Sequence, residues 1–178
     1  MENIEELVYK AKKRDNLAFT RLIQMLKNDL YKIAKMRLNC EDDIEDAVQE
    51  TIIVAYKNIG KVRNAQYFKT WLIRVLINKC NEIYKANKRR NYASIDEQIE
   101  KDSYDLSEDK NIEKLNFYSL ITKLNYDERI SLILFYLMEF TTKEISKILK
   151  EPESTIRNRI ARARSKLKDI YKEENIYG

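Results

Sequence analysis

The 178-residue sequence contains no histidine, two glycines, one proline and two cysteines. Without histidine, the chain cannot form a Ser-His-Asp triad or the usual histidine-containing zinc sites. Its glycines, Gly60 and Gly178, are too few and too far apart for a loop that cradles phosphate. These absences exclude most enzyme classes, and the sequence predicts no catalytic residue, no cofactor and no metal site.

The scarcity of glycine and proline also predicts a chain that is helical almost throughout, because these residues are the main helix breakers. Apolar periodicity places helices at about 3–13, 16–38, 42–58, 65–89, 111–123, 126–139, 142–150 and 153–172. Residues 91–110 lose this periodicity and carry seven acids against two lysines, which is typical of a solvated linker. We therefore expect an all-α protein, with two small helical bundles at 1–90 and 111–178 joined by a flexible acidic linker at 91–110.

Two cysteines, Cys40 and Cys80, make neither a disulfide framework nor a metal cluster, and we expect two buried, reduced thiols. The amino-terminal residues mix acids and lysines without an apolar core, so they do not resemble a signal peptide. The longest apolar run, residues 130–138, is too short to span a bilayer. Together these features predict a cytoplasmic protein. Its net charge of +5 favours a polyanionic partner only weakly, so the distribution of charge matters more.

Basic side chains are concentrated near the carboxyl terminus. Residues 154–171, STIRNRIARARSKLKDIY, contain six of them before the first acid, Asp169. The stripe predicted to face the core consists of Ile156, Ile160, Ala163, Leu167 and Ile170. The opposite side carries short residues, Ser154, Asn158, Ala161 and Ser165, flanked by Arg157, Arg164, Arg162 and Lys166. Such a helix can enter a DNA groove, although a merely solvated basic face is the alternative interpretation.

The residues before this helix favour the DNA-binding interpretation. Thr141 and Glu144 have the spacing of a capping box, which begins a short helix through Ile145 and Ile148. That helix ends before Pro152, and a short turn leads into the basic helix. This is the layout of a helix-turn-helix, whose second helix reads the DNA major groove.

The first bundle contains an acidic face. Within residues 42–56, the side predicted to be buried carries Ile44, Val48, Thr51 and Ala55. The other side groups Asp42, Asp46, Gln49 and Glu50 around Ile53. An exposed isoleucine among carboxylates predicts a docking surface for a basic protein. An ordinary acidic helix face is the alternative, whereas a magnesium-dependent nuclease would need a second acidic cluster, which is not evident.

The next predicted helix, at 65–89, has basic residues on its outer side instead of acidic ones. Its core side is predicted to carry Leu72, Val75, Leu76 and Ile83, and its outer stripe carries Arg74, Asn78, Asn81, Lys85 and Lys88. A stripe of cations and amides can follow a phosphate backbone and bond to bases. It begins beside a polar loop with Lys61, Arg63, Asn64 and Gln66, which suits an unstacked base. The aromatic residues Tyr67, Phe68 and Trp71 also suit unstacked bases, although we expect Phe68 and Trp71 to be core residues.

In this order, four stretches resemble the extracytoplasmic-function (ECF) group of bacterial sigma-70 family factors. DIEDAVQETIIVAY resembles the family's polymerase-docking helix, and FKTWLIRVLINKCNEIYKANKRR resembles its helix for promoter melting and −10 reading. LNYDERISLILFYLMEFTTKEISKIL resembles the entry into its helix-turn-helix, and STIRNRIARARSKL resembles its −35 recognition helix. Residues 1–90 would then form a region 2-like domain and residues 111–178 a region 4-like domain.

The resemblance implies that this chain directs core RNA polymerase to promoters and begins DNA melting, with chemistry left to the polymerase. It implies polymerase binding by Asp42, Asp46, Gln49, Glu50 and Ile53. The −10 element would meet Lys61, Arg63, Asn64, Gln66, Arg74, Asn78, Asn81, Lys85 and Lys88. The −35 element would meet Ser154, Thr155, Arg157, Asn158, Arg159, Ala161, Arg162, Arg164, Ser165 and Lys166. The partners implied are core polymerase, promoter DNA and an anti-sigma factor, commonly membrane-bound.

Several positions depart from the family's pattern. Lys150 stands where a turn glycine is usual, and Glu151 stands where an apolar residue is common. Glu139 replaces another frequent glycine, and Asn125 replaces a frequent proline. A lysine in a left-handed conformation would cost about 1 kcal/mol.

Two other function classes fit part of the sequence. A helix-turn-helix regulator with a sensor or dimerisation domain explains the carboxyl-terminal half, and predicts tight duplex binding without polymerase. An all-helical adaptor that uses only the acidic face predicts no DNA binding. If the protein, mixed with sigma-free core polymerase and a promoter library, produced specific start sites, it would be a sigma factor and both other classes would be excluded.

Overall fold

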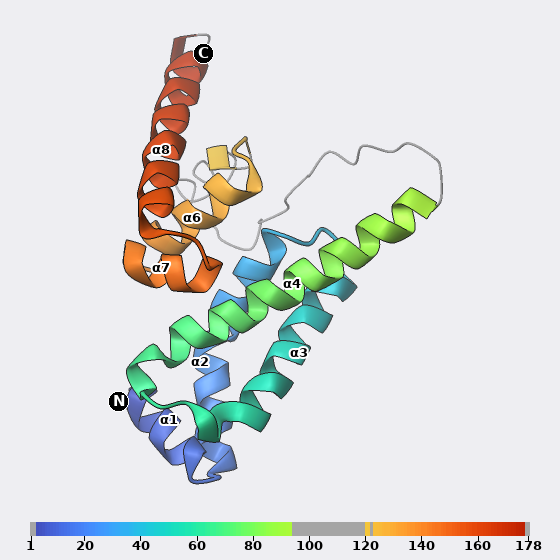
Figure 1. The fold of residues 1–178 in the computed structure, drawn as a ribbon, viewed down its shortest axis with the longest axis vertical. Helices are drawn as coiled ribbons and strands as arrows, with labels where there is room; N and C mark the ends of the chain where they lie inside the picture. The colour runs from blue at the N-terminus through green and yellow to red at the C-terminus, as the bar shows by residue number, and fades with distance from the viewer. Residues whose placement is uncertain (1–2, 94–119, 122, 177–178) are drawn as a thin grey trace. The chain divides into compact units, whose positions relative to one another are not determined.

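The computed structural model describes residues 3–93, 120, 121 and 123–176, and every regular element in these ranges is a helix (Figure 1). The first helices are α1 (Ile4–Lys12), α2 (Asn16–Lys35), α3 (Glu41–Asn58) and α4 (Phe68–Ala93). Two short 3-10 helices, η1 (Ile59–Lys61) and η2 (Ala65–Tyr67), connect α3 to α4. The later helices are α6 (Tyr126–Tyr136), α7 (Thr142–Leu149) and α8 (Glu153–Ile176). The predicted all-α fold class is confirmed.

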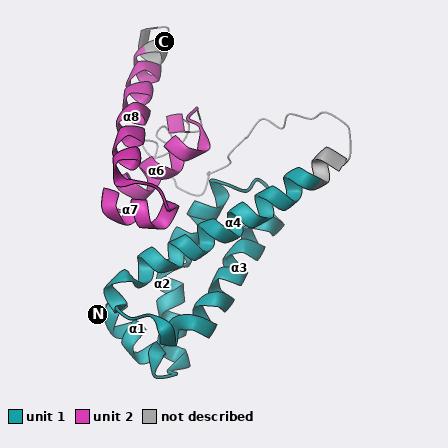
Figure 2. Cartoon of the chain, in the orientation of Figure 1, with its two compact units in different colours: residues 1–96 teal, residues 97–178 magenta. Residues whose placement is uncertain are grey.

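The chain divides into two compact units, residues 1–96 and 97–178 (Figure 2). Of the predicted linker at 91–110, only residues 91–93 are described, and they extend α4 beyond its predicted end near residue 89. The extension has a simple cause, since neither glycine nor proline interrupts this stretch. The rest of the linker, and nearly all of the helix predicted at 111–123, lie outside the described residues.

Unit 1 is a four-helix arrangement in which α1 packs on α2, α2 on α3, and α3 on α4 (Figure 1). Its core contains Leu22, Leu30, Ile44, Phe68 and Leu72, all almost completely buried. Each such side chain contributes about 1.5–3 kcal/mol on removal from water. The predicted inward side of α3 is confirmed, because Ile44, Val48, Thr51 and Ala55 are buried.

Unit 2 packs α8 against α6 and α7. The predicted core stripe of α8 is buried at Ile156, Ile160 and Ala163, whereas Leu167 and Ile170 are only half-buried. Toward its carboxyl end α8 therefore leaves the packed core. The burial nevertheless fixes which side of the helix faces outward.

Polar caps set the beginnings of several helices. Asn3 and Asp15 accept hydrogen bonds from Glu6 N and Ala18 N, at 2.8 and 3.0 Å. Asn125, which replaces a family proline, caps α6 by accepting from Glu128 N at 2.9 Å. The predicted capping box at Thr141 and Glu144 is present in α7. A cap of this kind contributes about 1 kcal/mol.

The two thiols differ, which corrects one expectation. Cys80 is buried on α4, but Cys40 is exposed. Cys40 lies at the N-cap position of α3, where the extended backbone leads from α2 and directs the side chain away from the core. Periodicity does not reach this position, because it belongs to neither helix. Among the described helices, none has the length and apolarity needed to cross a bilayer.

Candidate functional site

The outward face of α8 is formed by short polar residues between cations. Arg157, Arg162 and Arg164 are exposed, as are Ser154, Asn158, Ala161 and Ser165, while Thr155 is half-buried. Within the described chain, no ion pair is found for these three arginines. They therefore present full positive charge at the surface, with room for close approach between them.

Two other cations of α8 are held by acids of the same unit. The Arg159 guanidinium donates to both carboxylate oxygens of Glu151, at 3.1 and 2.6 Å. Lys166 Nζ lies 2.6 Å from Oε1 of Glu128, a largely buried carboxylate on α6. Both residues were predicted to bind DNA, and both are already engaged within unit 2.

A left-handed turn joins α7 to α8. Lys150 has φ 58° and ψ 40°, the conformation expected of the family's glycine. The Glu151 amide donates to the Ser146 carbonyl at 3.1 Å, and Ser146 Oγ donates back to the Glu151 carbonyl at 2.6 Å. These bonds satisfy the carboxyl end of α7 in the manner of a Schellman motif, with lysine in place of glycine.

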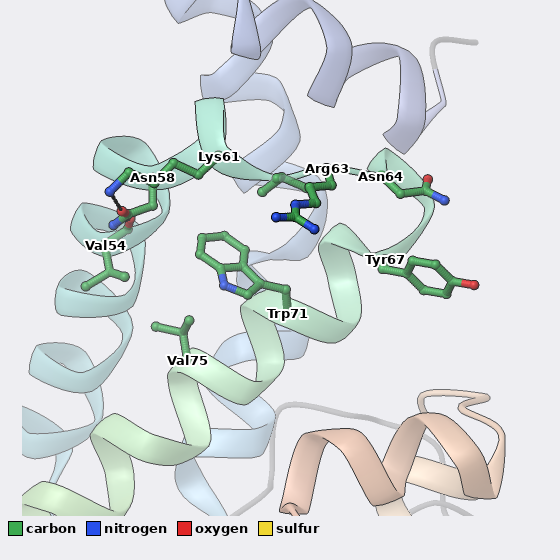
Figure 3. Close-up of a pocket in the computed structure, with 9 residues that line it drawn as sticks. Val54, Asn58, Lys61, Arg63, Asn64, Tyr67, Trp71 and Val75 are labelled. Carbon is green, nitrogen blue, oxygen red and sulfur yellow. Dashed lines mark hydrogen bonds between the residues drawn. The ribbon is translucent and has the colours of Figure 1, made fainter.

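In unit 1, a cavity of about 500 Å³ lies beside the predicted base-contacting loop. Its lining comes from α3, the loop and α4, through Val54, Asn58, Lys61, Val62, Arg63, Asn64, Tyr67, Trp71 and Val75. Trp71 projects from α4 toward the loop with Arg63 beside it, whereas the Tyr67 ring points away from the indole (Figure 3). A volume of this size is within the range of ligand pockets.

Trp71 was expected in the core, and this expectation is only partly correct. Phe68 is fully buried, but Trp71 is half-buried and lines the cavity. The rings of Phe68 and Trp71 pack with their centroids 5.7 Å apart. The Trp71 indole thus contacts the core through Phe68 and also lines the cavity. Helical spacing alone cannot distinguish these two roles.

Several hydrogen bonds fix the loop that lines the cavity. Lys12 Nζ, on α1, donates to the Val62 carbonyl at 2.7 Å. Lys61 Nζ donates to Asn58 Oδ1 at 3.0 Å, and Asn64 Oδ1 accepts from Gln66 N at the same distance. Of the predicted loop residues, Lys61, Arg63 and Asn64 line the cavity, and Gln66 is exposed outside its lining.

The outer stripe of α4 is accessible along its length. Asn78, Lys85 and Lys88 are exposed, and Arg74 and Asn81 are half-buried. The neighbouring Lys79 lies 2.9 Å from Glu50 on α3 and 3.1 Å from Glu82. Its hydrogen bond to Glu50, helped by Glu82, raises the pKa of Lys79, so the lysine stays charged.

The acidic face of α3, which consists of Asp42, Asp46, Gln49, Glu50 and Ile53, is exposed as predicted. Ile53 is 51% exposed, a large fraction for an isoleucine in a folded protein. Because Glu50 pairs with Lys79, the charge that remains uncompensated is concentrated on Asp42 and Asp46. The face thus has Ile53 toward its carboxyl-terminal end and two carboxylates that form no ion pair within the described part of the chain.

Comparison with known proteins then gives the family. Residues 22–90 match Sigma-70 region 2, and residues 114–167 match Sigma-70 region 4. The chain is 30% identical over 170 residues to the ECF RNA polymerase sigma-E factor of Escherichia coli K12, covering 89% of this chain and 88% of that one. This chain belongs to the ECF group of sigma-70 family sigma factors.

Other known proteins are also similar to this sigma factor. The ECF RNA polymerase sigma factor SigW of Bacillus subtilis 168 is 29% identical over 178 residues, covering 93% of this chain and 95% of that protein. Among solved structures, the sigma factor RpoE of Bartonella quintana, in complex with the anti-sigma factor NepR, has a TM-score of 0.74 at 23% identity, covering 86% and 96% of the two chains. CnrH, in complex with the cytosolic domain of CnrY, has a TM-score of 0.68 at 22% identity, covering 96% and 97%. These two structures share its fold.

Sequence reasoning gave no role in these sites to three residues that shape them, and for a fourth, Trp71, it favoured a core role. Lys12 fixes the cavity loop, Trp71 lines the cavity, and Glu151 and Glu128 hold two cations of α8. For Glu151 a signal existed, since an acid in an apolar turn position has to find a partner when the turn packs. For Lys12 and Glu128 the sequence gives no signal, because their partners are 50 and 38 residues away.

Proposed function

We propose that this sigma factor brings core RNA polymerase to promoters by docking through α3, opening the −10 element with unit 1 and reading the −35 element with α8. The match of one chain to both region 2 and region 4 is the observation that carries this proposal. Catalysis of RNA synthesis belongs to the polymerase, and this chain is not itself an enzyme. Its place of action is the cytoplasm.

The acidic face of α3 is the proposed polymerase-docking surface. Asp42 and Asp46 provide negative charge on the amino-terminal part of the face and Ile53 provides an apolar contact further along it, which suits a basic partner surface with an apolar pocket. Gln49 and Glu50 complete the contact, with Glu50 also bonded to Lys79. The charges orient the two proteins, and burial of Ile53 adds an apolar contact.

The cavity beside the 61–66 loop is the proposed receptor for a base displaced from the −10 element. Unstacking one base costs a few kcal/mol. Stacking on Trp71 can offset about 1–3 kcal/mol of this cost, and Asn64 places an amide group in the lining for hydrogen bonding to the base. The stripe of Arg74, Asn78, Asn81, Lys85 and Lys88 would hold the adjoining backbone.

The outward face of α8 is the proposed reader of the −35 element. Its short residues Asn158, Ala161 and Ser165 allow the helix to approach base edges in the major groove. Arg157, Arg162 and Arg164, which flank them, reach phosphates on either side. The preceding helix α7, begun by its capping box, supports the recognition helix as in other helix-turn-helix proteins.

An anti-sigma factor, commonly membrane-bound in this family, is the proposed regulator of this chain. Support comes from two solved structures of similar fold, RpoE in complex with the anti-sigma factor NepR and CnrH in complex with the cytosolic domain of CnrY. A regulator that covers the acidic face of α3 would compete with polymerase for the same carboxylates.

The test is reconstitution with sigma-free bacterial core polymerase and a promoter library, followed by mapping of transcript 5′ ends. We expect discrete start sites with this chain and none without it. Tight duplex binding without polymerase, combined with no start sites, would instead identify a stand-alone helix-turn-helix regulator. No start sites and no DNA binding would identify an adaptor.

A further inference from the structure

Arg159 and Glu151 form the best-defined ion pair of unit 2. Two parallel hydrogen bonds, of 3.1 and 2.6 Å, join the guanidinium to the carboxylate in a bidentate arrangement. The Arg159 side chain is only 11% exposed, and that of Glu151 is 33% exposed. A planar fork bonded in this way, and largely withdrawn from water, is geometrically specific and stronger than an ordinary surface pair.

The position of the pair is as informative as its geometry. Glu151 directly follows the strained residue Lys150 and shares two hydrogen bonds with Ser146 on α7. Arg159 lies two turns into α8. The pair therefore spans the turn, and connects the end of α7 to the part of α8 that carries the outward arginines. It is placed where it can fix the angle at which α8 leaves the turn.

We propose that Arg159 is a positioning residue for −35 recognition, acting through Glu151 to hold α8 in its reading orientation and making no phosphate contact itself. The DNA-binding part of this inference rests on the proposed function. Arg162 is the natural contrast, because it lies on the same helix and is exposed without an ion pair among the described residues. The pair also compensates for lysine at a turn position that favours glycine.

The direction in which Glu151→Gln changes DNA affinity separates a positioning role of Arg159 from direct contact with DNA. Glu151→Gln removes a negative charge from a surface that faces DNA, and Coulomb's law alone predicts stronger DNA binding. If the pair positions α8, the same substitution weakens binding, because Arg159 loses its charged partner and the turn loosens. A fall in affinity on removal of a carboxylate would thus support positioning, and a rise would overturn it.

The first experiment measures binding of the reconstituted holoenzyme to a labelled −35 duplex between about 50 and 200 mM salt. Arg162→Ala, the control, should flatten the slope of log K against log salt by about 0.9, the value for one phosphate contact. Arg159→Ala and Glu151→Gln should each lower affinity by about five- to tenfold at every salt concentration, with the slope unchanged. A flatter slope for Arg159→Ala would overturn the proposal.

Arg159→Lys tests the geometry and covers the case in which alanine destabilises the turn too far. Lysine keeps the positive charge but cannot form the bidentate fork. A phosphate contact that uses Arg159 only as a point charge would survive this change with nearly normal affinity, whereas positioning predicts a loss close to that of Arg159→Ala. Near-normal affinity for Arg159→Lys would contradict the inference.

The second experiment needs neither polymerase nor promoter, so it distinguishes failure of this inference from failure of the proposed function. Hydrogen–deuterium exchange of the full-length protein alone should rise about fivefold in residues 146–156 for Arg159→Ala and for Glu151→Gln. The double variant should exchange no faster than either single variant, because both remove the same interaction. Unchanged exchange, or additive effects, would overturn the inference, even if the wild-type protein supports transcription.

Discussion

At the scale of single residues, three positions in the described part of the chain adopt a backbone conformation that normally favours glycine. Arg14, Glu139 and Lys150 have φ values of 67°, 58° and 58°. For residues with a side chain, the left-handed region costs about 1–2 kcal/mol. The resemblance to known sigma factors flagged Glu139 and Lys150 in advance, because the family favours glycine there. It did not flag Arg14, which follows the end of α1.

Lys150→Gly should therefore stabilise unit 2. Relief of the left-handed strain outweighs the extra entropy of glycine in the unfolded chain, for a net gain of about 0.5–1 kcal/mol. Thermal unfolding followed by circular dichroism would measure the change. Lys147→Gly, inside α7, is the matched control and should destabilise by about 1 kcal/mol. A lower melting temperature for Lys150→Gly would contradict the strain argument.

The two cysteines should react very differently with a thiol reagent at neutral pH. Cys40 is exposed and should be labelled at once, whereas Cys80 should react only when unit 1 unfolds. Burial raises the pKa of the Cys80 thiol from 9.0 to about 12, which leaves almost no thiolate in the folded protein. Rapid labelling of two thiols per chain in the native protein would contradict this assignment.

The same shift of the Cys80 pKa sets a pH dependence. Because the folded pKa lies above the unfolded one, the neutral thiol favours folding below pH 9.0, and this contribution disappears between pH 9.0 and about 12. Wild-type protein should therefore lose stability relative to Cys80→Ala as pH rises through this window. Urea unfolding of both proteins at several pH values would measure the difference, and a constant difference would contradict it.

At the scale of helices, the faces were predictable and the ion pairs were not. Periodicity correctly assigned Ile44 and Ala55 to the core and Ile53 to the surface, because burial of a helical residue follows its angle around the axis. The pairing of Arg159 with Glu151 depends on the path of a turn, and that of Lys166 with Glu128 on the packing of two helices. Composition and residue spacing reveal neither the path of the turn nor the packing of the helices. The sequence predictions therefore did not separate Arg159 and Lys166 from the other cations assigned to the −35 element.

The acidic face of α3 gives the clearest prediction at this scale. Asp46→Lys should lower affinity for core polymerase by at least about tenfold, since it replaces attraction by repulsion at the centre of the proposed contact. Binding would be measured by titration of labelled protein with core enzyme. Glu5→Lys, an equal charge change at an exposed position of α1, should bind almost normally. If both variants lost the same affinity for core polymerase, the cause would be the net charge of the protein and not the acidic face of α3.

At the scale of the whole molecule, each unit has its own proposed surface for nucleic acid. Unit 1 provides the cavity and the α4 stripe, and unit 2 provides the outward face of α8. The sequence predicts two bundles, because a stretch without periodicity separates two periodic halves. The cavity itself was not predictable, since its lining combines α3, the loop and α4.

Variants in the two units should affect different steps of promoter use. Arg63→Ala, at the cavity, should reduce DNA opening, measured by permanganate reactivity of unpaired thymines, while −35 binding stays normal. Arg162→Ala should reduce initial binding and leave opening of the bound fraction unchanged. Because the two residues belong to separate units, their effects on overall transcription should multiply. A strong departure from the product would show that the two steps are coupled.

The bond from Lys12 to the Val62 carbonyl has a practical consequence for hybrids between sigma factors. The region 2 match begins at residue 22, so a domain exchange designed on that boundary would transplant the loop and leave α1 behind. The loop would then arrive without the ammonium group that fixes its backbone. A chimera intended to transfer −10 preference should carry residues 4–12 together with residues 59–67.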